Sequence, residues 1–206
     1  MEKRPTTLWY QFFDVLLNIV IIVAVVGAIR TFLVSPFQVE GSSMMDTLED
    51  RQYIIINKLT YFIGHPKRGD VVVFRPPNVD HTKFYVKRII GLPGDAVILR
   101  DGSVYVIPGG KGPEQKLPEP YLNNRNLSHT FSAVNGGSDE KRYDVPAGEY
   151  FVLGDNRTGS LDSRSFRDTH NNFTPFVTEY DIKGQVWMVL LPLSKFHTLT
   201  TAEYGI

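Results

Sequence analysis

Residues 85–107 read YVKRIIGLPGDAVILRDGSVYVI and carry the clearest structural signal in this chain. Short runs rich in Val and Ile are separated by LPGD at 92–95 and by DG at 101–102. Pro, Gly and Asp favour tight turns, and apolar β-branched runs between such turns are typical of strands. The stretch therefore predicts consecutive strands joined by turns.

The same alternation of apolar runs and turn residues continues through the chain after residue 34. Short apolar runs alternate with Gly, Pro, Asn and Asp, and we expect only short helical turns, at 43–50 and 178–181. Strands that follow one another through tight turns pair antiparallel. The sequence thus predicts a mainly β protein built on a mostly antiparallel sheet. The expected strands are 37–41, 52–58, 70–74, 83–90, 96–99, 104–107, 150–153 and 185–191.

The N-terminal part of the chain has a different pattern. Between residues 15 and 29 the only polar side chain is Asn18. A helix needs about 20 mostly apolar residues to cross the hydrocarbon core of a bilayer, so residues 9–29 predict a transmembrane helix. A cleaved signal peptide would end in small residues, whereas Arg30 follows here. A core helix would be amphipathic, but residues 19–29 are apolar on every face.

The charges that flank this segment predict its orientation. Lys3 and Arg4 precede it, and Arg30 is the only Lys or Arg that follows it before Arg51. Cytoplasmic flanks of transmembrane helices carry the excess of Lys and Arg. We therefore expect a cytoplasmic N-terminus, a single membrane-spanning anchor, and a body of the protein on the other side of the membrane.

Length and composition predict three regions. A chain of 206 residues corresponds to one domain with attachments at about 150 residues per domain. Residues 1–34 form the N-terminal stub and anchor, and residues 35–107 and 143–206 form the β-rich domain. The stretch between them, 108–142, has 16 Gly, Pro, Asn or Ser residues. It predicts an insertion or a small β appendage.

The composition also excludes several classes of function. Lys and Arg number 22 and so do Asp and Glu, so there is no surplus of positive charge to bind nucleic acid. There is no Cys, which rules out disulfides, thiolate nucleophiles and Cys-ligated metal sites. No His-Glu-x-x-His or EF-hand pattern occurs, and none of the 5 His residues lies in a recognisable Ser-His-Asp context. We expect no metal and no cofactor.

Lysine is the general base that these exclusions leave. A lysine becomes a base near neutral pH when burial disfavours its charged form. Lys87 lies inside an expected strand, where alternation puts it on one face with Tyr85 and Ile89. The same pattern also fits a lysine on an edge strand that faces solvent. Ser43 follows another expected strand and fits either a nucleophile or an ordinary turn residue or N-cap.

Three segments, in order, resemble the sequence boxes of type I signal peptidases, the serine peptidases with a Ser-Lys dyad. They are GSSMMDTL at 41–48, YVKRIIGLPGD at 85–95 and GDNRTGSLDSR at 154–164. A fourth, GDVVVF at 69–74, lies between the first two. Together with the predicted anchor, the resemblance covers most of the chain except 108–142. It implies the fold that signal peptidases share with SOS-repressor autopeptidases.

The resemblance also implies a catalytic role for particular residues. Ser43 corresponds to the nucleophile and Lys87 to the general base. Ser160 corresponds to the serine that orients this lysine. Gly41 stands near the oxyanion hole, where some family members have a serine as a second donor. Met44 follows the family pattern beside the nucleophile.

The third box supplies structural support in this reading. Asp155, Asn156 and Arg157 build its turn, and Asp162 and Arg164 correspond to a pair that shapes it.

Two departures from the family pattern occur near Ser43. Asp46 replaces a usual proline, and EDR at 49–51 replaces a usual Gly-Asp.

The resemblance implies a membrane-bound serine endopeptidase that removes N-terminal signal peptides from secreted precursors. Its partners would be precursors with small residues at −3 and −1 of the cleavage site, and the lipid bilayer of a bacterial plasma membrane, with the catalytic domain extracytoplasmic. Apolar residues at 32–37 and 187–193 fit either contact with lipid or a place in the core. A weak or inactive membrane-tethered β module that binds a partner, and a dedicated processing peptidase of narrow range, are the alternatives. An SOS-repressor-like autopeptidase would have a DNA-binding domain in place of the anchor.

Overall fold

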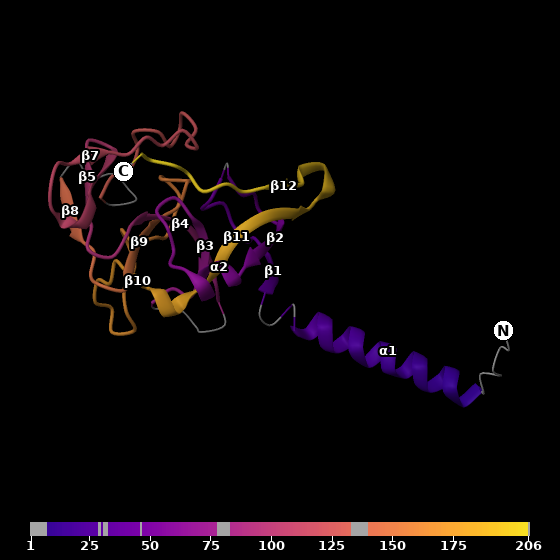
Figure 1. The fold of residues 1–206 in the computed structure, drawn as a ribbon. Coiled ribbons are helices and arrows are strands. Elements are labelled where there is room, and N and C mark those ends of the chain that lie inside the picture. The colour runs from indigo at the N-terminus through magenta and orange to yellow at the C-terminus, as the bar shows by residue number, and fades with distance from the viewer. Residues whose placement is uncertain are drawn as a thin grey trace.

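The computed structural model describes residues 8–28, 30, 33–45, 47–77, 83–132 and 140–205. A long N-terminal helix, α1 (Leu8–Ala28), precedes a body made mostly of strands (Figure 1). The strands are β1 (Val34–Gln38), β2 (Tyr53–Asn57), β3 (Val71–Phe74), β4 (Tyr85–Gly91), β5 (Ala96–Arg100), β6 (Ser103–Ile107), β7 (Gln115–Lys116), β8 (Lys141–Asp144), β9 (Glu149–Leu153), β10 (Val177–Thr178), β11 (Ile182–Leu191) and β12 (His197–Thr198). Short helices are α2 (Leu59–Ile63), η2 (Pro108–Gly110), η3 (Glu179–Asp181) and η4 (Leu193–Lys195).

The strands form a large sheet and a small sheet. The large sheet has the order β1-β2-β11-β3-β4-β9-β10, with β12 paired to β11, and the small sheet has the order β7-β6-β5-β8. Every strand pair within the described residues is antiparallel. The predicted fold class, a mainly β protein with a mostly antiparallel sheet and an apolar N-terminal helix, is therefore confirmed.

The chain passes from the large sheet to the small sheet between β4 and β5. Gly91 ends β4, and a Cβ at this position would lie 2.5 Å from Val97 Cγ2 and 3.1 Å from Phe151 Cβ. Glycine is therefore the residue that lets the two sheets approach each other. Gly94 in the following turn has φ +87°, a backbone conformation that L side chains rarely adopt. The turn predicted at 92–95 thus lies where the two sheets join.

All eight expected strands are present, and β7, β8, β10 and β12 are four further strands that were not expected. The first strand was expected at 37–41 and lies at 34–38, because Gly41 with φ +89° ends the extended backbone. Pro36 is accommodated because β1 is an edge strand of the sheet, where an N–H is not required. Helix α2 was not expected. Of the two expected helical turns, 178–181 contains η3, and 43–50 contains a single turn with a Leu48 N–H to Met44 O bond of 2.8 Å.

The core consists of three apolar clusters. One lies between the large sheet and the small sheet and includes Ile90, Val97 and Phe151. A second packs Met44 and Leu48, from the loop after β1, against strands β2, β3 and β11. The third lies around β3, β9 and the start of β11. The loop after β1 is thus held by its own buried side chains, which fixes the position of Ser43 next to Met44.

Residues 117–130 connect β7 to the region before β8 and pack against the body. Leu117, Leu122, Asn126 and Thr130 are buried there, together with the carboxylate of Glu119. The small sheet itself pairs β6 with β7 and β5 with β8. Part of the stretch 108–142 is therefore packed β structure, and residues 133–139 lie outside the described residues.

Candidate active site

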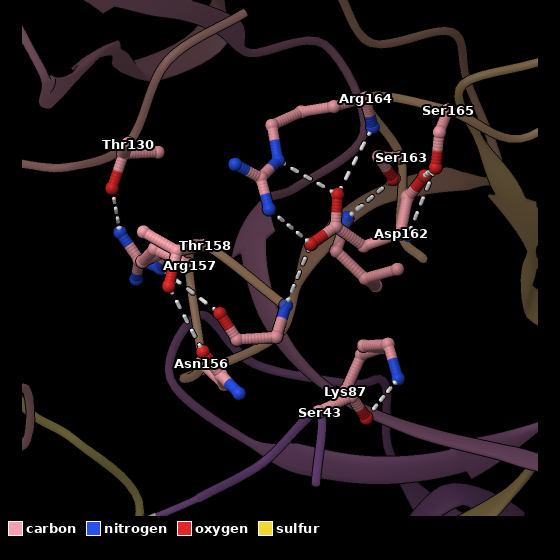
Figure 2. A network of polar contacts seen from close by, with 12 residues as sticks. Ser43, Lys87, Thr130, Asn156, Arg157, Thr158, Asp162, Ser163, Arg164 and Ser165 are labelled. Carbon is pink, nitrogen blue, oxygen red and sulfur yellow. Dashed lines mark hydrogen bonds and ion pairs between the residues drawn. The ribbon is translucent and has the colours of Figure 1, made fainter. Parts of the chain in front are cut away.

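Strand β4 brings Lys87 to Ser43. β4 lies between β3 and β9 in the large sheet, and the Lys87 side chain is 3% exposed. The alternative of a solvent-facing lysine on an edge strand is therefore wrong. Lys87 Nζ donates to Ser43 Oγ at 2.7 Å and to the Val86 carbonyl at 2.8 Å (Figure 2). Two residues 44 positions apart thus lie within proton-transfer distance.

Burial changes the acid–base chemistry of this lysine. Removal of the ammonium from water lowers the pKa of Lys87 to about 8, although the nearby carboxylates of Asp162 and Asp155 oppose the shift. The desolvated amine is thus neutral in a substantial fraction of molecules near pH 8. A neutral amine 2.7 Å from a hydroxyl can accept its proton, which is what a serine nucleophile requires.

The loop that carries Ser43 is fixed at both ends. The Gly41 N–H donates to Asp50 Oδ1 at 2.7 Å, and the Met45 N–H donates to the Ser42 carbonyl at 3.1 Å. Met44 is buried in the core beside Ser43. A Cβ on Gly41 would meet nothing within 4 Å, so the positive φ, and not crowding, explains the glycine. Asp46, the predicted departure from the family pattern, lies outside the described residues.

Asn156 joins the nucleophile loop to the loop that follows β9. Its backbone N–H donates to the Ser43 carbonyl at 3.0 Å, and its side-chain Nδ2 donates to the Ser42 carbonyl at 3.0 Å. Both carbonyls next to the nucleophile are thus held by one residue. Asn156 therefore holds the nucleophile loop in addition to its predicted role in its own turn.

Asp155 forms a buried ion pair behind the site with Arg88, the residue after Lys87. Arg88 Nε donates to Asp155 Oδ1 at 3.0 Å and Nη2 donates to Oδ2 at 2.7 Å. The Thr47 hydroxyl also donates to Asp155 Oδ2. A bidentate pair of this kind fixes both partners in position, so β4, the nucleophile loop and the 155 turn are connected through one carboxylate.

Asp162 and Arg164 form a second buried pair. Arg164 Nε and Nη2 donate to the two Asp162 oxygens at 2.9 and 2.8 Å, and the Gly154 N–H donates to Oδ2 at 3.0 Å (Figure 2). Burial alone would raise the pKa of the Asp162 carboxyl, but Arg164, the Gly154 N–H and the nearby Ser160 hydroxyl hold it below its ordinary value. Asp162 is therefore a fixed anion that holds the Gly154 peptide.

Ser160 is buried against Gly154. A Cβ built on Gly154 would lie 2.2 Å from Ser160 Oγ and 2.5 Å from the Ser43 carbonyl oxygen. Among the described residues, the Ser160 hydroxyl has no hydrogen-bond partner of ordinary geometry, so no bond to Lys87 is present. The orienting role that the family resemblance implies for Ser160 stays a prediction.

A cleft opens onto Ser43 and Lys87. Its volume is about 530 Å³, and it runs between the end of β1 with the nucleophile loop and the residues at the start of β4. Its apolar lining includes Phe37, Ile54, Phe84, Val86 and Leu161. Within the described residues there is no group of three or more His, Cys, Asp or Glu placed to hold a metal ion.

Several residues of the site were not found from the sequence. The sequence showed Arg88 only as a charged residue inside an expected strand. The need for a charged partner follows from the interior position of β4 in the sheet, which the sequence did not show. Thr47, Glu119, Tyr121 and Thr130 carry no sequence signal for their roles. The last three contact the buried Arg157 and lie in the stretch that was read as an insertion or appendage.

Comparisons with known proteins find one family of peptidases. A family model described as signal peptidase, peptidase S26, matches residues 12–191. The chain is 38% identical over 194 residues to a signal peptidase I of Bacillus amyloliquefaciens, which covers 94% of this chain and 96% of the relative. It is 43% identical over 148 residues to signal peptidase I T of Bacillus subtilis strain 168, covering 71% and 72%. A solved signal peptidase I from Enterococcus faecalis is 32% identical, with a TM-score of 0.44 over 60% of this chain and 98% of that one.

Proposed function

This chain belongs to the signal peptidase I family, peptidase S26, and we propose that it removes signal peptides from secreted precursors with a Ser43–Lys87 dyad. The observation that carries this proposal is the 2.7 Å contact between Lys87 Nζ and Ser43 Oγ, made by a lysine whose pKa is lowered to about 8 by burial. Nucleophile and base are then available in the same cleft without a metal.

The reaction follows from these two side chains. The neutral Lys87 amine takes the Ser43 proton while Oγ attacks the scissile carbonyl, and the Ser43 backbone N–H is available to the developing oxyanion. The C–N bond then breaks, and the leaving amine takes the proton from Lys87. The Lys87 amine, neutral again, next removes a proton from water, which attacks the ester carbonyl; the C–Oγ bond then breaks and releases the signal peptide carboxylate. Ser43 regains its proton and the cycle closes.

Small apolar residues at −3 and −1 of the precursor fit the cleft. Part of the cleft lining is apolar, with Ile54, Val86 and Leu161 among its side chains, and an extended peptide presents alternate residues to the same wall. Two small side chains separated by one residue would face that wall together. A bulky residue at −1 would hold the scissile carbonyl away from Ser43 Oγ.

The function is tested by cleavage of a defined precursor. The full-length chain in detergent should cleave a precursor with an Ala-x-Ala site, and mass spectrometry should find the new N-terminus directly after the second Ala. A precursor that differs only by Trp in place of the −1 Ala should not be cleaved there. Absence of cleavage by folded protein would contradict the proposal and favour a membrane-tethered β module that binds a partner. Cleavage of only one of several such precursors would indicate a dedicated processing peptidase.

We expect activity to depend on pH through Lys87. The base acts when neutral, so kcat/KM should be low when the amine is protonated and should rise as pH increases through about 8, the lowered pKa of Lys87. The profile of kcat/KM reports ionisations of the free enzyme. It should be measured with a precursor that has no ionisable group near its cleavage site. A profile that stays flat from about pH 6.5 to 9.5 would contradict the role of Lys87 as base.

Helix α1 supports membrane tethering. It has 21 residues, about 31 Å at 1.5 Å per residue, which matches the hydrocarbon core of a bilayer. The span Trp9–Ala28 is long and apolar enough to cross a membrane, and none of its most apolar stretch is buried. The helix points away from the sheets (Figure 1). We expect the protein to stay in bacterial membranes through an alkaline carbonate wash, whereas release by that wash would contradict an integral anchor.

Exposed apolar side chains on the body fit contact with the same lipid surface. Phe62 and Ile63 of α2 are 85% and 84% exposed, and Leu193 of η4 is 75% exposed. In β11, Trp187 and Leu190 are also partly exposed, whereas the residue before each of them, Val186 and Val189, is buried. Of the stretch 32–37, residue 32 lies outside the described residues.

The charges before the anchor support its orientation. Because Lys3 and Arg4 precede it, we propose that the N-terminus is cytoplasmic and that the sheets lie on the other side of the membrane.

A further inference from the structure

Arg157 is a fully buried charge near the site, and its partners come from the stretch between the two sequence halves of the β domain. Its side chain is 0% exposed. Nη1 donates to Glu119 Oε2 at 3.0 Å and to Thr130 Oγ1 at 2.6 Å, and Nη2 donates to Glu119 Oε1. Figure 2 shows Thr130 reaching Arg157 from a separate segment. Burial alone would lower the pKa of the Arg157 guanidinium, but Glu119 holds it above its ordinary value.

The Nε donor of Arg157 faces the loop that follows β9, which we call the catalytic loop (residues 154–164). Nε donates to the Gly154 carbonyl at 3.0 Å, while the N–H of Gly154 is held by Asp162. Gly154 lies directly against the site, because a Cβ there would be 2.5 Å from the Ser43 carbonyl and 2.2 Å from Ser160 Oγ. The position of Arg157 therefore sets the position of the backbone that touches Ser43.

We propose that Glu119 and Thr130 are positioning residues for the peptidase reaction: they hold Arg157, which holds the Gly154 backbone against Ser43. The inference rests on the proposed function and adds a task for residues 117–130, which the family boxes do not include. In this arrangement the segment is a support for the catalytic loop. It acts through Arg157, and among the described residues Lys87 Nζ is hydrogen-bonded to Ser43 and Val86 and not to this segment.

The physical basis is the cost of an unpaired buried charge. Removal of one partner of a buried ion pair leaves the other charge desolvated without compensation. Arg157 without the Glu119 carboxylate would have to move toward water or recruit it, and either change pulls Nε away from Gly154. A displacement of about 1 Å at a reacting centre, caused by a change far from the chemistry, can reduce the rate about 100-fold.

A second contact connects the same segment to the buried ion pair of Arg88 and Asp155. Tyr121 OH donates to Glu119 Oε1 at 2.9 Å, and its ring lies 3.9 Å from the guanidinium carbon of Arg88. Arg88 in turn holds Asp155. Arg88 and Arg157, two of the buried arginines of the site, therefore both contact residues 119–121. Residues 119–121 therefore support the loop after β9 at two positions, at Gly154 through Arg157 and at Asp155 through Arg88.

The test compares Glu119→Gln with Glu114→Gln in the full-length protein. Glu114 makes an ion pair with Arg100 on the small sheet and, among the described residues, makes no hydrogen bond or ion pair with Arg157 or Gly154, so its variant makes the same change of charge outside this network. We expect Glu119→Gln to lower kcat about 10- to 100-fold with little change in KM, because loop geometry and not precursor binding is altered. Glu114→Gln should retain the kcat of the wild type.

Thr130 provides a milder change in case Glu119→Gln does not fold. Thr130→Val removes the hydroxyl that accepts from Arg157 and keeps the shape, so kcat should fall less than in Glu119→Gln, and Thr130→Ser should restore it. A general loss of packing would not be rescued in this way. Equal kcat in wild type, Glu119→Gln and Thr130→Val would overturn the inference and leave the proposed function intact.

Amide hydrogen exchange tests the inference without reference to activity. Peptides that cover residues 154–164 should exchange faster in Glu119→Gln than in wild type or Glu114→Gln, because the Gly154 N–H to Asp162 bond loses its support. Unchanged exchange in this loop would overturn the inference. A wild type that cleaves no precursor would contradict the proposed function instead, and the exchange result would still decide whether Glu119 positions the loop.

Discussion

Replacement of Ser43 by alanine is expected to reduce kcat/KM on signal-peptide precursors by about 10³-fold or more. Removal of a serine nucleophile leaves only the contributions of binding and of the oxyanion donors. In this chain the effect should be large because no other described hydroxyl is hydrogen-bonded to Lys87 Nζ. The fold should be unaffected, since Ser43 is only partly buried and its neighbour Met44 carries the packing of the loop.

The matched control for this variant is Ser194→Ala. Ser194 is an exposed serine in η4, so its variant removes the same hydroxyl at a distance from the cleft and should keep full activity in detergent. Both variants should unfold at the temperature of the wild type. Residual cleavage of Ser43→Ala within about tenfold of the wild type would show that another group supplies the nucleophile.

The fold was largely predictable because strands and turns leave local signals. The turn at 92–95 and the apolar runs around it are visible in the sequence, and the structure has β4 and β5 there. The start of β1 was missed because Val34 continues the apolar pattern of the anchor, so the boundary between lipid-facing helix and strand has no local mark. Helix α2 was missed because LTYFI at 59–63 is rich in residues that favour strands.

The candidate site was predictable only for residues whose side-chain chemistry suits few roles other than catalysis. Lys87 and Ser43 were identified by the need for a base and by the family boxes, but the pattern alone could not tell a buried lysine from a solvent-facing one. That choice depends on β9 pairing with β4, which is a contact between distant segments. Likewise, the bond of Glu119 to Arg157 joins residues 38 positions apart. A periodic pattern in the sequence does not indicate a contact between such distant residues.

Replacement of Lys87 by methionine should abolish cleavage and also stabilise the protein. Methionine has a similar length and no charge, so it removes the base and fits a site that is 3% exposed. Burial lowers the pKa of Lys87 from 10.5 to about 8. Below pH 8 the folded protein therefore carries a desolvated ammonium, at a cost of about 3 kcal/mol relative to the unfolded chain. The methionine variant does not bear this cost, and its melting temperature should be higher at pH 6 to 7 by several degrees.

The sign of the pH dependence distinguishes this explanation from better packing of the methionine. Between pH 8 and 10.5 the unfolded chain holds a proton on Lys87 that the folded protein has lost, so the wild type gains stability as pH rises through this range. The advantage of Lys87→Met in free energy of unfolding should be largest below pH 8 and should shrink toward pH 10.5. Lys116→Met, at an exposed position in β7, should show no such trend. Denaturant unfolding of the three proteins from about pH 6 to 10 measures this difference. An advantage that is independent of pH would mean that Lys87 is not a desolvated base, and the dyad would then lose its physical basis.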